Sequence, residues 1–230
     1  MINKQVFIRA LLIYVIPYLV LLVVILGLLC CYPKPELHML LNSRHSAFQD
    51  TFFKYYTLLA EWPLYLLALL PLFWKKGKIT LFFAVSELTG GVFLQLLKHT
   101  ICIDRPVCLF EHYPQWVLPL VEGVDMHHSN SFPSGHASTF FVFCTCCVIV
   151  LTYFYSRKGK SYDLKTRLLF DLSLLVLLVL ATLGAYSRVY LSQHFLSDVY
   201  VGGIIGFVTP FLIFYLFRKK FLKPKKQEIK

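Results

Sequence analysis

Six long apolar runs constrain this chain more than any other feature of its sequence. They cover about residues 6–31, 60–75, 78–100, 135–155, 167–190 and 195–217. All but the second reach the roughly 20 residues that an α-helix needs to cross a hydrocarbon core. The chain is 57% hydrophobic with a mean hydropathy of +0.64, well beyond an ordinary soluble domain. We predict an all-α integral membrane protein whose six transmembrane helices form a bundle, in a single domain over residues 1–230.

The segment between the first two runs has a different character. Residues 36–61 are amphipathic and rich in Phe and Tyr, which is typical of a helix that lies in the plane of a membrane interface. The pair Trp62-Pro63 then turns the chain inward, and the basic residues 75–78 form a short hairpin before the third run. We therefore expect an outer interfacial amphipathic helix in addition to the six spans.

The basic residues are sorted by loop. The net charge is +11, and 17 of the 23 Lys and Arg residues fall on one side of the predicted bundle, at both chain ends and in the loops at 75–78 and 157–167. The positive-inside rule makes that side, with both termini, cytoplasmic. The charge is thus a topology signal rather than a nucleic-acid site, and six basic residues remain outside: Lys34, Arg44, Lys54, Lys98, Arg105 and Arg188.

Three polar segments stand at the outer ends of the predicted spans. They are Lys98-His99-Thr100-Ile101-Cys102-Ile103-Asp104-Arg105-Pro106, then Ser131-Phe132-Pro133-Ser134-Gly135-His136, then residues 187–198. The cations Lys98, Arg105 and Arg188 require an anionic partner, and arginine offers a fork that fits phosphate oxygens. Ser134 and Gly135 at a helix start add free N–H groups. The three segments together predict a phosphate pocket.

The same segments contain a nucleophile and a general acid. His194 and Asp198 are four residues apart, so on a helix they share a face and the carboxylate can orient the imidazole. His136 supplies a second imidazole that can protonate a leaving alkoxide and then activate water. With the cations stabilising charge on the phosphoryl oxygens, these residues suffice for a covalent phosphohistidine route without a metal or cofactor.

The three segments together resemble the signature of the type 2 phosphatidic acid phosphatase family, which is related to vanadium haloperoxidases. That signature is Lys, six residues, Arg-Pro; then Pro-Ser-Gly-His; then Ser-Arg, five residues, His, three residues, Asp, and no motif position departs from it. Each residue alone is more often a structural or anchoring group. The resemblance implies phosphate binding by Lys98, Arg105, Ser134, Gly135 and Arg188, with His136 as general acid and His194 as the nucleophile that Asp198 orients.

The resemblance also implies a class of substrate. Family members act on lipid phosphates such as undecaprenyl diphosphate, phosphatidylglycerol phosphate, phosphatidic acid, sphingoid phosphates or lipid A, and composition does not choose among them. The compact form is similar to bacterial enzymes of the inner membrane, with the active site on the periplasmic face. A lipid phosphotransferase could use the same residues. An anion transporter fits less well, because the ionisable residues gather at one face.

Several other residues stay outside the predicted site. Glu87 lies about 16 Å deeper than Lys98 on the same helical side, with a structural or a functional role open. Cys102 and Cys108 could form a disulfide around Arg105 or remain thiols. No cysteine or histidine spacing is typical of a metal site. The histidines 99, 112, 127 and 128, with Asp104, are not included in the catalytic set, and the oligomeric state is left open.

Overall fold

The computed structural model describes residues 3–157 and 163–221, and these residues form helices and connecting loops with no strand. Lys158, Lys160 and the basic tail from residue 222 lie outside the described residues. The helices in chain order are α1 Lys4–Ala10, the π-helical η1 Leu11–Val15, α2 Ile16–Cys31, α3 Lys34–Leu41, α4 Ala47–Tyr56, the 3₁₀ helix η2 Thr57–Ala60, α5 Trp62–Thr100, α6 Pro106–Phe110, α7 Gly135–Arg157, α8 Leu164–Tyr190 and α9 Leu196–Phe221.

Five helical stretches among the described residues are long and apolar enough to cross a membrane. They are Lys4–Cys31, Gly77–Thr100, Gly135–Arg157, Leu164–Tyr190 and Leu196–Arg218. Each matches one of the predicted spans to within a few residues. The predicted span over residues 60–75 is not among them.

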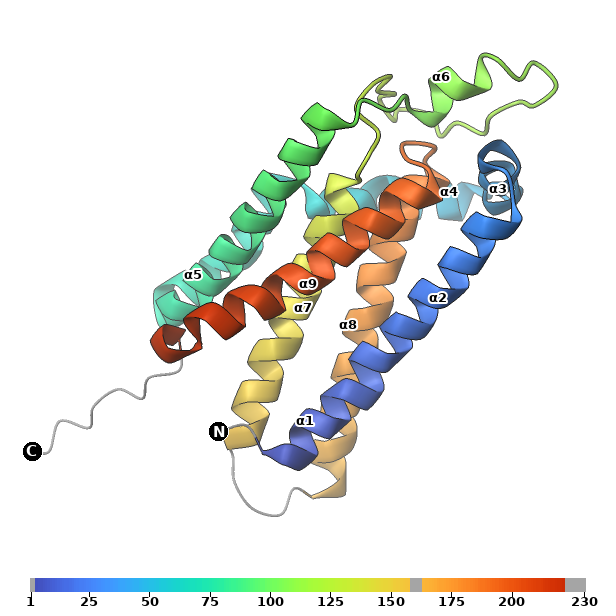
Figure 1. Ribbon diagram of the computed structural model, residues 1–230. Coiled ribbons are helices and arrows are strands. Elements are labelled where there is room, and N and C mark those ends of the chain that lie inside the picture. The colour runs from blue at the N-terminus through green and yellow to red at the C-terminus, as the bar shows by residue number, and fades with distance from the viewer. Residues whose placement is uncertain (1–2, 158–162, 222–230) are drawn as a thin grey trace, which may run out of the picture.

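The chain reverses direction within α5. The Tyr65 hydroxyl donates to the backbone carbonyl of Phe83 at 3.5 Å. In a straight helix these residues would be separated by about 27 Å. The reversal therefore falls between them, where the hairpin at residues 75–78 is predicted (Figure 1). The arm before that hairpin is only about 22 Å long, shorter than a hydrocarbon core of about 30 Å.

The single helix predicted over residues 36–61 is divided into α3, α4 and η2. The break follows Asn42, which caps the end of α3. Ser46 then caps α4, because its hydroxyl accepts a hydrogen bond from the backbone N–H of Gln49 at 3.3 Å. Figure 1 shows α3, α4 and α6 together at one end of the long helices.

The helices α7 and α9 approach each other at glycines. A Cβ atom on Gly202 would lie 2.3 Å from the carbonyl oxygen of Ser134, and one on Gly206 would lie 2.2 Å from that of Ser138. No side chain fits at either position. The small-xxx-small spacing thus lets the two backbones touch, as it does in other membrane helix pairs.

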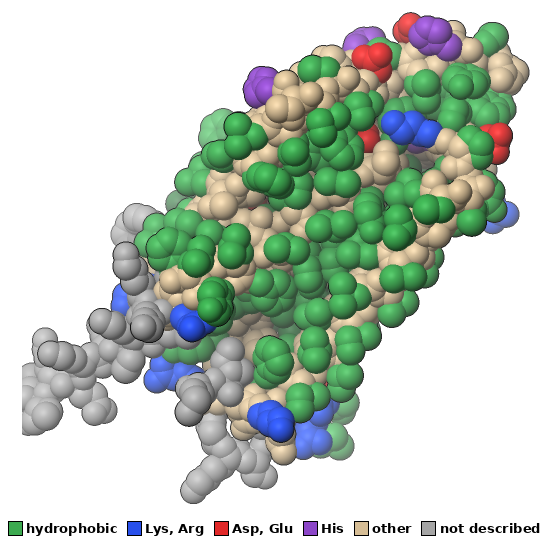
Figure 2. Space-filling model, in the orientation of Figure 1, with side chains coloured by type: hydrophobic (Ala, Val, Ile, Leu, Met, Phe, Trp, Pro, Cys, Tyr) green, Lys and Arg blue, Asp and Glu red, His purple; other side chains and the backbone are tan. Residues whose placement is uncertain are grey.

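The sides of the bundle are apolar and its two ends are not. Figure 2 shows hydrophobic side chains along the visible face, with histidine and acidic groups at the end that holds α6 and basic groups mainly at the opposite end. Near that opposite end, Arg9 of α1 is paired with Asp171 of α8. This distribution fits a protein whose sides face lipid.

Candidate active site

A tight turn between α8 and α9 positions His194. After Arg188, the chain leaves the helix through Ser192, which adopts a left-handed conformation with φ of 52°. The backbone N–H groups of both Gln193 and His194 then donate to the carbonyl of Arg188 at 3.0 Å. His194 is consequently 2% exposed and folds back over the end of α8.

Asp198 lies in the first turn of α9, directly beside His194. Its Oδ2 accepts from the backbone N–H of Phe195 at 3.0 Å and from the Ser131 hydroxyl at 2.5 Å. The imidazole Nδ1 of His194 is 3.7 Å from Oδ2 and 3.4 Å from the Ser131 oxygen. The shared helix face that the spacing predicts is not the reason for this proximity, because His194 precedes the helix.

The proton arrangement follows from these contacts. The Ser131 hydroxyl uses its one proton on Asp198, so its oxygen can only accept from His194 Nδ1. A neutral imidazole that carries its proton on Nδ1 has a lone pair on Nε2. Arg105 Nη1 lies 3.5 Å from this Nε2. The unprotonated nitrogen thus faces a cation.

The segment from Ser134 to His136 is joined to α9 through the backbone. The N–H of Ser134 donates to the carbonyl of Asp198 at 3.0 Å, and the Ser134 hydroxyl accepts from the N–H of Ala137 at 3.4 Å as the N-cap of α7. Gly135 and His136 form the first turn of α7, whose leading N–H groups have no partner within a helix. The positive N-terminal end of α7 therefore stands beside Asp198 and His194.

Arg105 enters the site from the long loop after α5. Its backbone N–H donates to the carbonyl of His128, and the N–H of Ser131 donates back to the carbonyl of Ile103 at 2.8 Å. The guanidinium donates through Nη1 to the Gln193 carbonyl at 2.9 Å and through Nε to the Ser129 carbonyl at 3.0 Å. The loop and the turn between α8 and α9 thereby both hold the buried guanidinium.

The three predicted cations all influence one loop residue, His127. Arg188 is buried and donates to the hydroxyl of Thr57 in η2 at 2.9 Å. Lys98 stands in the last turn of α5. Partial burial lowers the pKa of His127, and Arg105, Arg188 and Lys98 lower it further through their positive charges. A single loop residue therefore lies within the field of all three.

His194 is held in its neutral form. Burial lowers its pKa well below the usual range of histidine, and Arg188 and Arg105 act in the same direction, against the opposing effect of Asp198. A neutral imidazole keeps the lone pair on Nε2 that an attack on phosphorus requires.

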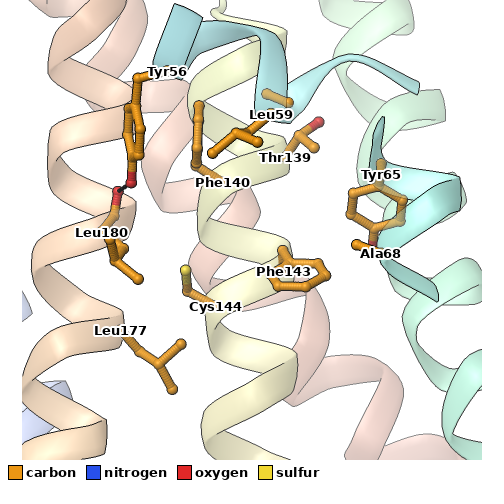
Figure 3. Close-up of a pocket in the computed structure, with 11 residues that line it drawn as sticks. Tyr56, Leu59, Tyr65, Ala68, Thr139, Phe140, Phe143, Cys144, Leu177 and Leu180 are labelled. Atoms are coloured by element: carbon orange, nitrogen blue, oxygen red, sulfur yellow. Dashed lines mark hydrogen bonds between the residues drawn. The ribbon is translucent and has the colours of Figure 1, made fainter. Parts of the chain in front are cut away.

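An apolar cavity of about 200 Å³ lies beside this site, between η2, the start of α5, α7 and α8 (Figure 3). Its lining includes Tyr56, whose hydroxyl donates to the carbonyl of Leu180, and Thr139 and Phe140, which are one turn beyond His136 on α7. Thr139 donates to Glu87 at 2.5 Å. The Glu87 carboxylate thus links α5 to α7 through Thr139, which lines the cavity.

Sequence patterns did not identify Ser131, Gln193 or Thr57 as site residues. Ser131 and Gln193 adjoin motif residues, but Thr57 is 131 positions from its partner Arg188 and carries no local signal. Cys102 and Cys108 are both free thiols. Among the described residues there is no group of three or more His, Cys, Asp or Glu arranged to hold a metal ion.

Fold and site together define a polytopic helical membrane protein with buried histidine, aspartate and arginine side chains gathered at one end of its bundle. The family model of the PAP2 superfamily matches residues 79–222, more than half of the chain, and the protein belongs to that superfamily. No curated protein sequence matches it.

Two solved structures share the fold. Aquifex aeolicus LpxE is 22% identical, with a TM-score of 0.59 over 80% of this chain and 97% of that one. A PAP2-type phosphatidylglycerolphosphate phosphatase from Bacillus subtilis is 18% identical, with a TM-score of 0.56 over 92% of this chain and 98% of that one. At these identities the likeness concerns the fold.

Proposed function

We propose that this protein is a membrane lipid phosphatase that cleaves a phosphomonoester or diphosphate of a lipid through a phosphohistidine intermediate. One observation carries the proposal. Nε2 of buried His194 lies 3.5 Å from Arg105 Nη1, and Gln193 Oε1 next to it accepts from both Arg105 and Arg188. A phosphoryl group bound to these cations would have its phosphorus in front of a nucleophilic nitrogen.

In the first step, Nε2 of His194 attacks phosphorus and the bond to the lipid oxygen breaks. His136 donates a proton to the departing alkoxide or phosphate, and Asp198 stabilises the positive imidazole through Ser131. Lys98, Arg105 and Arg188, with the N–H groups near Ser134 and Gly135, stabilise the charge that spreads over the phosphoryl oxygens. These groups supply the stabilisation without a metal or cofactor.

In the second step, His136 has lost its proton and accepts one from a water molecule. That water attacks the phosphohistidine, the N–P bond breaks, and inorganic phosphate leaves. The lone pair returns to His194 Nε2. Each proton taken in one step is returned in the other.

A lipid substrate suits the surroundings of the site. The apolar cavity is lined by Thr139 and Phe140, one turn beyond His136 on α7, and could accept a hydrocarbon chain of the substrate. Candidates are undecaprenyl diphosphate, phosphatidylglycerol phosphate, phosphatidic acid and lipid A. The printed name of the Bacillus subtilis neighbour, a phosphatidylglycerolphosphate phosphatase, favours including phosphatidylglycerol phosphate.

The proposed membrane arrangement follows the predicted one. The two arms of α5 would serve as separate crossings, giving six in a single domain, with α3 and α4 in the outer interface. The basic residues at the end that carries Arg9 would face the cytoplasm of a bacterial cell, and the active site would face the periplasm.

The test is phosphate release by the detergent-purified protein in the presence of EDTA, across undecaprenyl diphosphate, phosphatidylglycerol phosphate, phosphatidic acid and lipid A. We expect release from at least one of these lipids and inhibition by orthovanadate, a phosphate mimic. Activity that appears only when a metal is restored would contradict the metal-free route. Transfer of labelled phosphate to a lipid acceptor instead of water would identify a phosphotransferase.

A further inference from the structure

The two buried arginines of the site meet at one uncharged side chain. Gln193 is 1% exposed, and its Oε1 accepts from Arg105 Nη1 at 3.2 Å and from Arg188 Nη2 at 3.5 Å. Its backbone carbonyl accepts a further bond from Arg105 Nη1 at 2.9 Å. Gln193 thus connects a cation from the loop after α5 with a cation from α8.

The opposite end of the amide fixes its orientation. Nε2 donates to the carbonyl of Asp125 at 2.9 Å and lies 3.1 Å from the sulfur of Met126. A flipped amide would turn its donors toward two guanidinium groups, which have no acceptor. The hydrogen-bond network therefore assigns the oxygen to the arginines and the nitrogen to the loop.

An uncharged acceptor at this position has a chemical advantage. Two guanidinium groups that share a buried site repel each other, so a group that accepts from both lowers the free energy of their proximity. A carboxylate would accept more strongly, but it would also neutralise part of the charge that binds phosphate. The amide holds the two cations and leaves their net charge intact.

We propose that Gln193 is a positioning residue that sets the direction and spacing of the Arg105 and Arg188 guanidinium groups for the phosphoryl group of the substrate. The inference rests on the proposed function, because a phosphoryl group is the ligand that the two cations would share. Gln193 itself touches neither the phosphorus nor the leaving group in this scheme.

The test compares two substitutions that change the charge and hydrogen bonding of this side chain but little of its size. Gln193→Met removes the acceptor, and Gln193→Glu keeps it but adds a negative charge. Gln95→Met, at an exposed position on α5, is the control. The dissociation constant of orthovanadate is measured from the ligand-dependent rise in melting temperature of the purified protein.

We expect orthovanadate binding to weaken about tenfold in Gln193→Met and further in Gln193→Glu, with the control unchanged. KM for the lipid phosphate should rise in the same order. A purely structural role predicts the reverse order, because glutamate is closer to glutamine in shape and acceptors. Wild-type affinity in either folded variant would overturn the proposal, so one folded variant is enough to decide.

Failure of the function and failure of this inference give different results. A wild-type protein that neither binds orthovanadate nor releases phosphate would contradict the proposed function. A wild-type protein that does both, alongside Gln193 variants that bind orthovanadate equally well, would remove only the role of Gln193.

Discussion

In the stretch Gly135–Arg157, 61% of the residues in the most apolar 18-residue segment are buried inside the protein, whereas in Lys4–Cys31 the share is 11%. The first stretch contains α7, which touches the backbone of α9 and begins at the candidate site. The second contains α2, most of whose residues face outward. Both stretches are apolar enough to cross a membrane, with mean hydropathies of 2.1 and 2.9, so the same criterion covers two different roles. The central helix α7 holds candidate catalytic groups, and the peripheral helix α2 mainly presents apolar surface.

The largest effect on activity is expected at His194, the candidate nucleophile, which lies near the start of the buried helix α7. Replacing His194 by alanine removes the attacking nitrogen, so phosphate release should fall by about 10⁴-fold or more. The measurement is initial-rate phosphate release with the lipid that the wild-type protein cleaves best. A His194→Ala variant with substantial turnover would overturn the assignment of the nucleophile.

The carboxylate at the start of α9 should have the next largest effect. Asp198→Asn keeps the size of the side chain but loses the charge that orients and stabilises His194, and kcat should fall by about 10²- to 10⁴-fold. Ser131→Ala provides a comparison, because Ser131 lies between the two groups. If the Ser131 variant loses as much activity as Asp198→Asn, the carboxylate acts mainly through this hydroxyl.

Substitutions at two glycines test whether the buried and the peripheral helices contribute differently to protein stability. A valine at Gly206 would place carbon 2.2 Å from the Ser138 carbonyl oxygen, so α7 and α9 must separate. We expect a loss of about 3 kcal/mol or more. The melting temperature would then fall by roughly 6 to 12 °C. Gly27→Val on α2 is the matched control, since nothing lies within 4 Å of that position. Equal losses in both variants would break the comparison.

The smallest predicted effect is a pH dependence that originates outside the long helices. Burial lowers the pKa of His38 from 6.5 to about 4. Its Nε2 is within hydrogen-bonding distance of the Ser192 hydroxyl and the Asn42 side-chain amide. Between these pH values the unfolded chain binds more protons than the folded protein. Stability should therefore fall as pH falls from 6.5 to 4, by up to roughly 3 kcal/mol.

His38→Gln keeps a hydrogen-bonding side chain that does not titrate in this range. The drop in melting temperature between pH 6.5 and pH 4 should become smaller in this variant. An unchanged drop would assign the acid sensitivity to other groups.

The sequence predicted the helical membrane class and five of the spans, because hydropathy is a local property. The catalytic and binding roles of the motif residues stay predictions. The sequence also predicted a hairpin at residues 75–78, within the part of α5 where the chain reverses. It did not predict the division of residues 36–61 at Asn42, because that division depends on packing and on caps. Thr57 illustrates the limit for the site. Its bond to Arg188 exists only because η2 packs against the end of α8, which no spacing within the sequence expresses.

Main-chain hydrogen bonds join the motif segments to one another and to the loop between them: Ser131 to Ile103, Arg105 to His128, and Ser134 to Asp198. A peptide hydrogen bond does not depend on which side chain its residue carries. Mutation can therefore rewrite much of the loop between Arg105 and Asp125, in composition and in length, while the reactive groups keep their places. Such an architecture allows the loop to change in evolution while the candidate catalytic residues stay in place.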